Sequence, residues 1–390
     1  MENHRSGSEK IWMDEASIKK ELKGVQNSKS SASLANSFLA DSYRAQYSFP
    51  KNLEFDSEGK CDFPFLSSSR YLGLIHADGN GLGEALIKIK NRFQDGAEYA
   101  VMLRLFSDNL EKATEEAAQK ATERLIERYQ KESGALPMRP LVLGGDDLTV
   151  LVRADYAMQF TEDYCKAFEE TTEKYFKELH TVSDRKIPVK LTACAGIAYI
   201  KNNQPFIDAF QLAESLCSAS KKIAKDVKVK ENRTFIPATV TSLVVTNSFI
   251  ESYDLYKKKE LTIKQKEKTY VATLGAYAFD EQEASIPTLK SLRNLCQELQ
   301  KEGVTASSVR KYATMIFGED HIAREKWRRW MELLGKDGKL DGLSNVLQLF
   351  GVKDVKESPW TEDNKTPIFD ALQLMSMDNS MKECREEKND

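Results

Sequence analysis

Three aspartates in two short glycine-containing segments have the residue type and spacing of a metal site. Asp78 begins the segment Asp-Gly-Asn-Gly-Leu-Gly, and Asp146 and Asp147 end the tetrapeptide Gly-Gly-Asp-Asp. Carboxylates brought together repel one another and are stabilised chiefly by divalent cations, and Mg²⁺ prefers carboxylate oxygens together with substrate phosphates. Two such ions about 3.5 to 4 Å apart activate a hydroxyl nucleophile and stabilise a departing pyrophosphate. If the aspartates converge, the pattern predicts nucleotidyl transfer with two Mg²⁺ or Mn²⁺ ions.

Glycines and lysines elsewhere in the sequence fit the same chemistry. Glycines after a strand leave backbone N–H groups free to approach a triphosphate at a helix start, and glycines in a hairpin present neighbouring carboxylates without obstruction. These glycines are Gly79, Gly81, Gly83, Gly144 and Gly145. Lys221 and Lys225 lie one helical turn apart, so both can reach the β- and γ-phosphates from one face. Each feature alone is typical of a surface turn or a solvated helix, and only their conjunction predicts a nucleotide site.

The elements that must position these residues follow the order β-α-β-β-α-β-α. Hydrophobic periodicity predicts strands at 71–77, 141–143, 148–152 and 188–200. It predicts one long helix or two consecutive ones at 97–129, and helices at 155–179 and 205–225. We expect Asp155 to cap the second helix. This order is the α+β, ferredoxin-like (βαββαβ) plan of palm and nucleotide-cyclase domains. In it, the end of the first strand and the central hairpin can lie side by side, which would bring Asp78 to Asp146 and Asp147.

The chain is expected to divide into three parts. Residues 1–69 are polar and read as an N-terminal accessory segment, and residues 70–248 contain the palm pattern. Beyond residue 249 we expect no further strands and a helical C-terminal domain. Its predicted helices span 285–301, 307–317, 322–334, 343–349 and 366–377.

Composition excludes several other classes of protein. The net charge of −3 over 390 residues gives no field for holding a long polyanion, so stable nucleic-acid binding is disfavoured. The six cysteines form no Cys-x-x-Cys pair, which argues against a zinc ribbon or a disulfide framework. No apolar run is long enough to span a membrane, and the first residues lack a secretory signal, so we expect a cytoplasmic protein. His76 is interpreted as a strand residue, and Trp327 and Trp330 as a packed helix face.

Four of these segments, in this order, resemble a known family. They look like the second palm domain of the large polymerase/cyclase subunit of type III CRISPR effectors, including its stand-alone relatives. The resemblance covers residues 70–245, under half of the chain. Its motifs are YLGLIHADGNGLG from Tyr71, LGGDDL from Leu143, LTACAGI from Leu191 and AESLCSASK from Ala213.

The resemblance implies an activity and roles for particular residues. Members of the family convert ATP into cyclic oligoadenylates by two-metal chemistry. Asp78 and Asp146 would bind metal with support from Asp147, the carbonyl of Gly79 would be a further ligand, and Lys221 would contact phosphate. Asn80 stands where many members have a second aspartate. Asn80 is therefore expected to touch ribose or base rather than metal.

The resemblance also implies a partner. The effector subunit carries a nuclease domain, a first palm and a zinc ribbon, and none of these is visible in this sequence. Palm cyclases of this type place one nucleotide in each of two facing palms. We therefore expect a homodimer, or pairing with another palm, that makes a cyclic second messenger in antiviral defence.

Three alternatives stay open. A diguanylate-cyclase-like enzyme using GTP is close in motif, but Leu148 replaces the aromatic residue of that enzyme's GGDEF signature. A catalytically silent palm could bind nucleotide as an interaction or structural subunit of a CRISPR-type complex. A template-copying polymerase ranks last because the sequence has near-neutral charge and no evident fingers or thumb.

Overall fold

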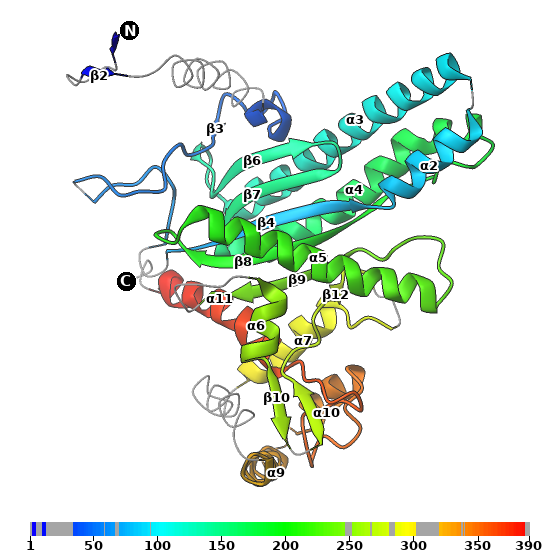
Figure 1. Ribbon diagram of the computed structural model, residues 1–390. Helices are drawn as coiled ribbons and strands as arrows, with labels where there is room; N and C mark the ends of the chain where they lie inside the picture. Colours follow the sequence, from blue (N-terminus) through cyan, green and yellow to red (C-terminus); the bar gives the residue numbers. More distant parts are fainter. Residues whose placement is uncertain are drawn as a thin grey trace.

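The computed structural model of this protein describes most of the chain (Figure 1). The described residues are 2–4, 10–12, 34–57, 59–66, 70–93, 95–245, 252–265, 267–280, 285–301, 320–336, 338 and 340–386. The helix predicted at 307–317 lies outside them. None of the helices described is both long and apolar enough to cross a membrane.

A six-stranded sheet in the order β12-β9-β8-β4-β7-β6 forms the centre of the fold. Its inner strand β4 runs antiparallel to both neighbours, β7 and β8, and β6 and β7 form the predicted hairpin. The order β8-β4-β7-β6 is the ferredoxin-like palm arrangement, which confirms the predicted fold class. The sheet strands are β4 (Tyr71–Asn80), β6 (Met138–Gly144), β7 (Asp147–Arg153), β8 (Thr192–Lys201), β9 (Thr239–Val244) and β12 (Tyr277–Ala278).

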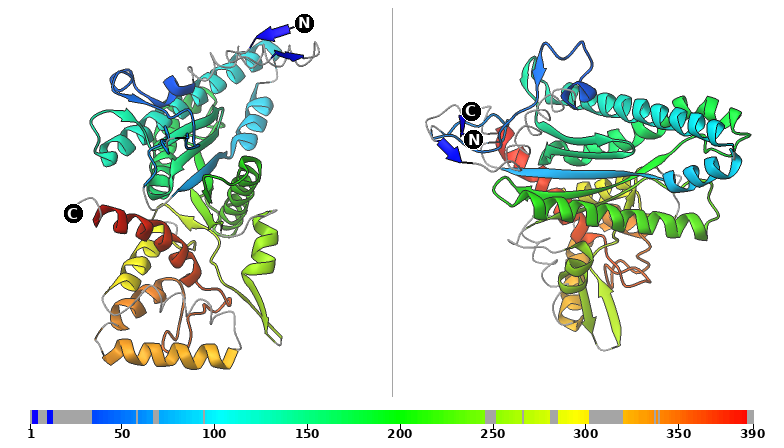
Figure 2. Two further views of the ribbon diagram at one scale, coloured as in Figure 1. Left: turned by 90° about the vertical axis from the view of Figure 1, so that its left-hand side faces the viewer. Right: turned by 45° about the horizontal axis from the view of Figure 1, so that its top comes forward.

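Helices cover both faces of the sheet. Alternate residues of β4 point to opposite faces, so Ile75 packs towards α3 (Gly96–Tyr129) and α4 (Ala154–Val182), whereas Leu74 packs towards α5 (Phe206–Lys230). Figures 1 and 2 show α3 and α4 on one side of the strands and α5 on the other. The shorter α2 (Leu82–Arg92) continues from the end of β4.

Small residues set the distance between sheet and helices. A Cβ added at Gly73 would lie 2.4 Å from the Cβ of Ala157 in α4, and one at Gly196 would lie 2.2 Å from the carbonyl oxygen of Ala213 in α5. A side chain at either position would therefore push a helix away from the sheet. Close contact at Gly196 fixes α5 against β8.

Two local predictions differ from the structure. The strand predicted to end at Ala77 continues through Asn80, because β4 pairs with β8 as far as Asn80 and Thr192. The turn signalled by the glycine-rich segment is confined to Gly81, whose φ of 84° is left-handed. Asp155 does not cap α4; its carboxylate instead binds the guanidinium of Arg153, the residue at the N-cap.

The expectation that strands stop at residue 249 is wrong. Strands β10 (Thr262–Gln265) and β11 (Lys268–Val271) form a hairpin, and β12 joins the main sheet beside β9. The remaining described elements are helical or very short. They are β1 (Glu2–His4), β2 (Lys10–Trp12), β3 (Tyr47–Ser48), β5 (Gly134–Ala135), α6 (Tyr253–Glu260), α7 (Leu289–Gln300), α9 (Asp320–Lys336), α10 (Leu340–Leu349) and α11 (Ile368–Glu386).

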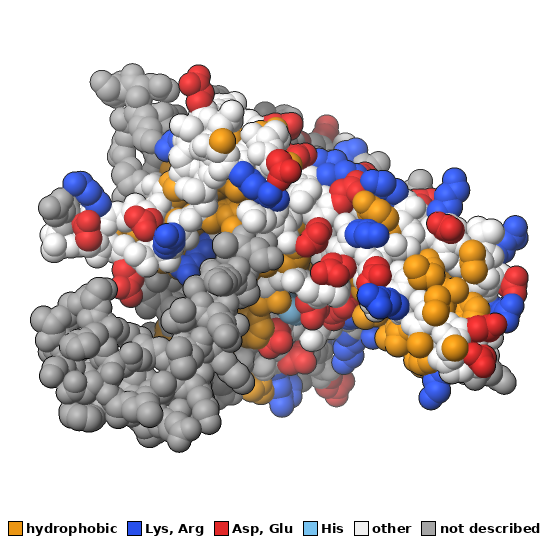
Figure 3. All heavy atoms as spheres, turned by 90° about the horizontal axis from the view of Figure 1, so that it is seen from above, with side chains coloured by type: hydrophobic (Ala, Val, Ile, Leu, Met, Phe, Trp, Pro, Cys, Tyr) orange, Lys and Arg blue, Asp and Glu red, His pale blue; other side chains and the backbone are white. Residues whose placement is uncertain are grey.

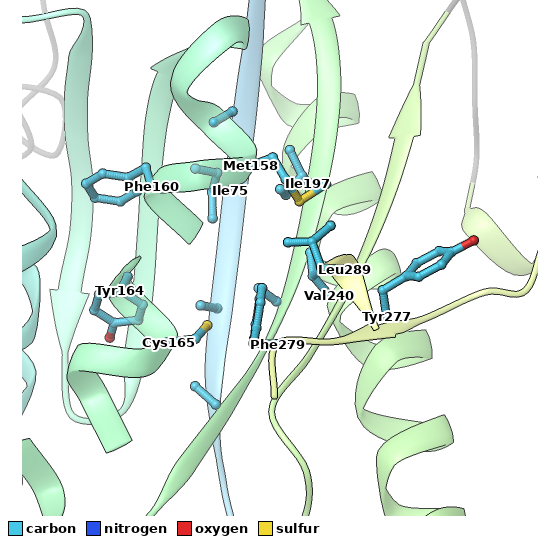
Figure 4. Packing of buried hydrophobic residues seen from close by; sticks show 14 of the residues in the cluster. Ile75, Met158, Phe160, Tyr164, Cys165, Ile197, Val240, Tyr277, Phe279 and Leu289 are labelled. Carbon is cyan, nitrogen blue, oxygen red and sulfur yellow. The ribbon is translucent and has the colours of Figure 1, made fainter. Parts of the chain in front are cut away.

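One hydrophobic core runs from the sheet into the C-terminal elements. Figure 4 shows Ile75 of β4, Ile197 of β8 and Val240 of β9 in a row that leads to Leu289 of α7. The N-terminal part also contributes, since Phe38 is fully buried in the same cluster. Burial of this apolar surface is the main stabilising contribution to the fold.

The C-terminal helices also bind the palm sheet through polar contacts. Gln373 of α11 accepts a hydrogen bond from the backbone N–H of Val244, and Asp370 accepts one from the Tyr277 hydroxyl. Trp327 is buried and donates its indole N–H to the carbonyl of Val355, so it belongs to the packed face that its helical spacing predicts.

Candidate metal and nucleotide site

The structure brings the three aspartates together. Asp78 lies near the end of β4, Asp147 begins β7, and Asp146 lies in the turn that precedes it. Because Ala77 pairs with Leu148, the strand end and the hairpin tip are neighbours. One carboxylate oxygen from each aspartate lies within 4.8 Å of the others. The predicted convergence is therefore present in the fold.

Two backbone features hold the hairpin tip in place. Gly145, the first residue of the two-residue turn, has a φ of 60°, which is the left-handed conformation that tight hairpin turns require. Its carbonyl oxygen lies 2.6 Å from the hydroxyl of Thr114, a buried residue of α3. A helix beneath the sheet therefore anchors the turn that carries Asp146.

Gly79 allows the close approach of strand and turn. A Cβ at this position would lie 2.6 Å from the Cβ of Asp146 and 2.9 Å from its Oδ2. No ordinary side chain fits in that space, so the need for glycine here is steric. Gly79 lies within β4, paired with Ala193, and not in a loop after the strand as the sequence indicates.

The electrostatics of the cluster favour a bound cation. Burial, together with the negative charges of Asp78 and Asp147, raises the pKa of Asp146 to about 6. The pKa of Asp147 is also raised, by burial and by Asp78. A cluster that binds protons more tightly than free carboxylates do is one that a divalent cation stabilises. Together with the nearby carbonyl of Gly79, this oxygen-rich donor set fits Mg²⁺ or Mn²⁺.

The three aspartates should lower the free energy of unfolding when no metal is bound. A raised carboxyl pKa means that the folded state binds the proton more tightly than the unfolded state, so stability falls as pH rises from about 4 to about 6. We expect Asp146→Asn to raise the free energy of unfolding at pH 7.5 by about 1 kcal/mol, after allowing for solvent screening. Urea unfolding in the presence of a metal chelator measures this rise in the free energy of unfolding. The rise should become smaller as the pH approaches 4.

The control is Asp226→Asn, which changes an exposed aspartate of α5. It should leave the free energy of unfolding within about 0.5 kcal/mol. A lower free energy of unfolding in Asp146→Asn would contradict destabilising repulsion among the three aspartates.

Lys221 reaches the acidic cluster from α5. Its ammonium group donates to Oδ2 of Asp78 at 2.6 Å and to the carbonyl oxygen of Gly79 at 2.7 Å. The contact depends on the close packing of α5 at Gly196. Lys221 therefore binds two groups that the family resemblance assigns to metal, the Asp78 carboxylate and the Gly79 carbonyl, whereas the sequence predicted that it reaches phosphate.

The other predicted lysine is not part of this contact. Lys225 lies one turn further along α5 and is exposed, and a phosphate role for it stays a prediction. Lys228, a residue that the sequence analysis did not single out, binds Glu84 of α2 at 3.0 Å. This ion pair connects α5 to the helix that follows the glycine-rich segment.

Asn80 is almost fully buried beside the cluster, at 3% exposed. Its Nδ2 donates to the hydroxyl of Thr192 and to the sulfur of Cys194. Thr192 in turn donates to the carbonyl of Ile236, so its oxygen can only accept from Asn80 and the amide orientation is fixed. Asn80 Oδ1 has no partner among the described residues. The predicted contact of Asn80 with ribose or base stays a prediction.

The predicted glycines occupy two places. Gly81 is the N-cap of α2, and Gly83 lies in the first turn of that helix, so their backbone N–H groups are at the positive end of a helix dipole. Gly144 ends β6 and is exposed at the hairpin, next to Gly145. Their predicted role in nucleotide binding is not tested by this geometry.

Sequence reasoning missed the residues that support the site from a distance. Thr114 under the hairpin and Gly196 under α5 are far from the aspartates in the chain. Thr114 has no local signal, since a threonine in a helix is ordinary, whereas Gly196 lies in the motif LTACAGI but was assigned no role there. Both become informative only once the packing of α3 and α5 is known.

Comparison with known families and structures gives three findings. Residues 71–232 match the family described as Cas10/Cmr2, second palm domain. A crystal structure of a Csm1–Csm4 cassette in complex with cA4 is similar at 11% identity and a TM-score of 0.40, covering 80% of this chain and 40% of that one. A crystal structure of Csm1 in T. onnurineus is similar at 12% identity and a TM-score of 0.41, covering 84% of this chain and 42% of that one.

The matches have defined limits. No curated protein matches the chain. The family match covers less than half of the sequence. The chain spans about two fifths of the length of the two solved structures.

Proposed function

We propose, from the premise that residues 71–232 form a second palm domain of the CRISPR-associated Cas10/Cmr2 type, that this protein is a nucleotidyltransferase that joins ATP into a cyclic oligonucleotide. The observation that carries the proposal is the convergence of Asp78, Asp146 and Asp147 within 4.8 Å. Mutually repelling carboxylates lower the stability of the fold unless a cation binds them, so their convergence at the end of β4 and the neighbouring hairpin tip favours a cation site.

The residues of the chain have separable tasks in this reaction. The three aspartates would hold the divalent cations, which would supply charge neutralisation at the reacting phosphate and activation of the hydroxyl. Backbone N–H groups at Gly81 and Gly83 would bind the triphosphate at the start of α2. Lys221, released from Asp78, would neutralise a phosphate oxygen.

The chemistry balances without any further reactant. A ribose hydroxyl of one ATP attacks the α-phosphorus of another, a phosphodiester P–O bond forms, and the P–O bond to the β-phosphate breaks. Pyrophosphate leaves, and the hydroxyl proton passes to water. Repetition within one oligomer closes the ring, so each ATP incorporated releases one pyrophosphate.

The proposal includes a second palm. Joining two nucleotides requires an acceptor to face the donor triphosphate, and the described part of the chain contains one acidic cluster of this kind. We therefore propose a homodimer, or pairing with another palm, that acts in antiviral signalling. The cytoplasm is the compartment proposed for this activity.

A catalytically silent, nucleotide-binding palm is the second candidate. The ion pair between Lys221 and Asp78 favours it, because an internal cation already satisfies one carboxylate. This candidate predicts that ATP binds and is not consumed.

The decisive experiment uses the full chain with labelled ATP, GTP, CTP and UTP and either Mg²⁺ or Mn²⁺. Mass spectrometry of the products should identify a cyclic oligonucleotide containing adenosine and an equivalent amount of pyrophosphate. A guanosine product would instead favour the diguanylate-cyclase alternative. ATP binding by calorimetry without any product under either metal would favour the silent palm.

Replacing Lys221 should separate metal binding from nucleotide binding. Lys221→Met removes the ammonium that binds Asp78 and Gly79, so the nucleotide-free protein should bind Mn²⁺ roughly fivefold to tenfold more tightly. ATP affinity should fall about tenfold because a charge-assisted contact to phosphate is lost. Electron paramagnetic resonance titration of Mn²⁺ and calorimetry with ATP measure the two effects.

Lys222→Met is the matched control, since Lys222 is exposed on the same helix. It should change neither affinity by more than about twofold. Unchanged Mn²⁺ affinity in Lys221→Met would show that Lys221 and the metal do not compete.

A further inference from the structure

A buried tyrosine lies beneath the hairpin that carries Asp146 and Asp147. Tyr164 belongs to α4, on the side of the sheet opposite to α5, and its side chain is 0% exposed. The Tyr164 hydroxyl has no hydrogen-bond partner among the described residues. Most buried polar groups in native folds have a partner, so a buried hydroxyl without one indicates a contact with a further group.

The Tyr164 hydroxyl is directed towards the hairpin turn. Figure 4 shows the Tyr164 ring beside the strands of the hairpin, with its oxygen towards the end at which they join. Burial, with the charges of Asp146 and Asp147 among the further causes, raises the pKa of Tyr164. The hydroxyl therefore stays protonated and can donate a hydrogen bond to a carboxylate.

Asp146 is the aspartate that reaches towards Tyr164. Alternate residues of β4 face opposite sides of the sheet, so Gly79 faces α4, as Ile75 and Ala77 do. A Cβ added at Gly79 would lie 2.6 Å from the Cβ of Asp146 and 2.9 Å from its Oδ2. The Asp146 carboxylate therefore lies on the α4 side of the strand end.

The Asp146 carboxylate has no side-chain donor among the described residues. It accepts a hydrogen bond from its own backbone N–H, and Lys221 donates to Asp78 instead. Thr114, also beneath the turn, already donates to the carbonyl oxygens of Leu110 and Gly145. Carboxylates that bind metal are generally hydrogen-bonded in turn by neighbouring groups. Tyr164 is a buried donor on the correct side of the sheet for this task.

Packing fixes the position of this donor. The Tyr164 ring stacks on Phe168 with 6.1 Å between ring centroids, and both belong to the main hydrophobic cluster. Seen from above, in a view onto α3 and the β6–β7 hairpin, acidic side chains form a group that is open to solvent (Figure 3). A cation can approach that surface from outside, whereas the Tyr164 hydroxyl acts from the interior.

We propose that Tyr164 is a positioning residue of the metal site. Its hydroxyl donates a hydrogen bond, through one water molecule, to the Asp146 carboxylate and so fixes which oxygen of Asp146 faces the cation. A water molecule is included because no acceptor among the described residues lies within direct hydrogen-bonding distance of the hydroxyl. The inference rests on the cation site of the proposed function, but metal binding tests it without any turnover.

Tyr164→Phe removes the hydroxyl and keeps the ring. In the full chain, Mn²⁺ affinity should fall about tenfold, as is typical when a hydrogen-bond partner of a metal ligand is lost. Electron paramagnetic resonance titration measures this affinity. Urea unfolding in chelator should give the same midpoint, because the packing of the ring is retained. Mn²⁺ affinity within about twofold of the original would overturn the proposal, whatever the midpoint.

Tyr129→Phe is the matched control. The Tyr129 side chain is 7% exposed, and its hydroxyl also has no partner among the described residues. Tyr129 ends α3, about 22 Å along that helix from Thr114. Removing its hydroxyl should leave Mn²⁺ affinity within about twofold of the original. An equal loss of affinity in Tyr129→Phe would contradict a specific role for Tyr164.

A spectroscopic measurement tests the contact itself. Mg²⁺ has no ultraviolet absorption, so a tyrosine difference spectrum on addition of Mg²⁺ reports a change at a phenol hydroxyl. We expect this difference band in the original protein and in Tyr129→Phe, and its loss in Tyr164→Phe at saturating Mg²⁺. A band that persists in Tyr164→Phe would come from another tyrosine and would overturn the proposed contact.

Turnover separates this inference from the proposed function. If cyclic product forms, Tyr164→Phe should lower kcat about tenfold and change KM for ATP less than about threefold, because Asp146 acts through the cations. Loss of Mn²⁺ affinity in a protein without turnover would support the role of Tyr164 and contradict the nucleotidyltransferase. Turnover with the original Mn²⁺ affinity in Tyr164→Phe would overturn the role of Tyr164 alone.

Discussion

Asp146→Asn combined with Asp147→Asn should lower the rate of cyclic oligonucleotide formation by at least about a thousandfold. The substitutions keep the size of both side chains and remove two of the three negative charges that converge at the hairpin. Product formation by mass spectrometry and Mn²⁺ binding by electron paramagnetic resonance are the two measurements. Both should be lost together.

Loss of activity through missing carboxylates can be distinguished from loss through unfolding. Removing repelling carboxylates should not unfold the protein, because burial and mutual repulsion already raise the pKa of Asp146. Asp226→Asn removes a charge elsewhere and should keep full turnover. Equal product from the doubly substituted and unsubstituted proteins would refute the nucleotidyltransferase, whatever the metal.

Gly79→Ala should be the most damaging change of a single methyl group. The added Cβ would lie 2.6 Å from the Cβ of Asp146, and neither the central strand nor the anchored turn can yield without moving a carboxylate. We expect metal affinity to fall at least tenfold and turnover about a hundredfold, as is typical when metal ligands are displaced by about 1 Å. Calorimetry with Mn²⁺ and initial rates measure the effect.

Gly96→Ala is the matched control for this change. Gly96 begins α3, and nothing lies within 4 Å of a Cβ added there. It should leave metal affinity and turnover unchanged and should slightly stabilise the helix. If Gly79→Ala behaved like Gly96→Ala, the close approach of β4 to the hairpin would not matter for function.

The sequence was sufficient for the palm fold and for the convergence of the aspartates, and the reason is topological. Alternating apolar runs and a Gly-Asp turn identify the strands and the hairpin, and the βαββ order leaves one arrangement in which Asp78 meets Asp146 and Asp147. Local sequence patterns of this kind can be recognised without knowing how the elements pack. Periodicity likewise predicted helix over 97–129 but left open one helix or two, and the structure has the single helix α3.

Features that depend on long-range pairing could not be predicted. Gly79 and Asn80 have turn-forming residue types, but hydrogen bonding to β8 extends the strand through them. The two-residue strand β12 has no periodicity to detect, and it exists because Tyr277 and Ala278 pair with β9. The contact of Lys221 with Asp78 depends on the depth of α5 at Gly196, which a sequence pattern does not encode.

The backbone segments that carry the aspartates differ in rigidity. Asp78 belongs to β4, which has a strand on each side, whereas Asp146 is at the tip of a hairpin whose outer strand β6 ends the sheet. Amide exchange at Asp78 requires opening of the centre of the sheet, whereas exchange at Asp146 requires only opening of the hairpin tip and of its hydrogen bond to Thr114. Adjustment of the ligand spacing to ions of different radius would therefore fall on the hairpin alone.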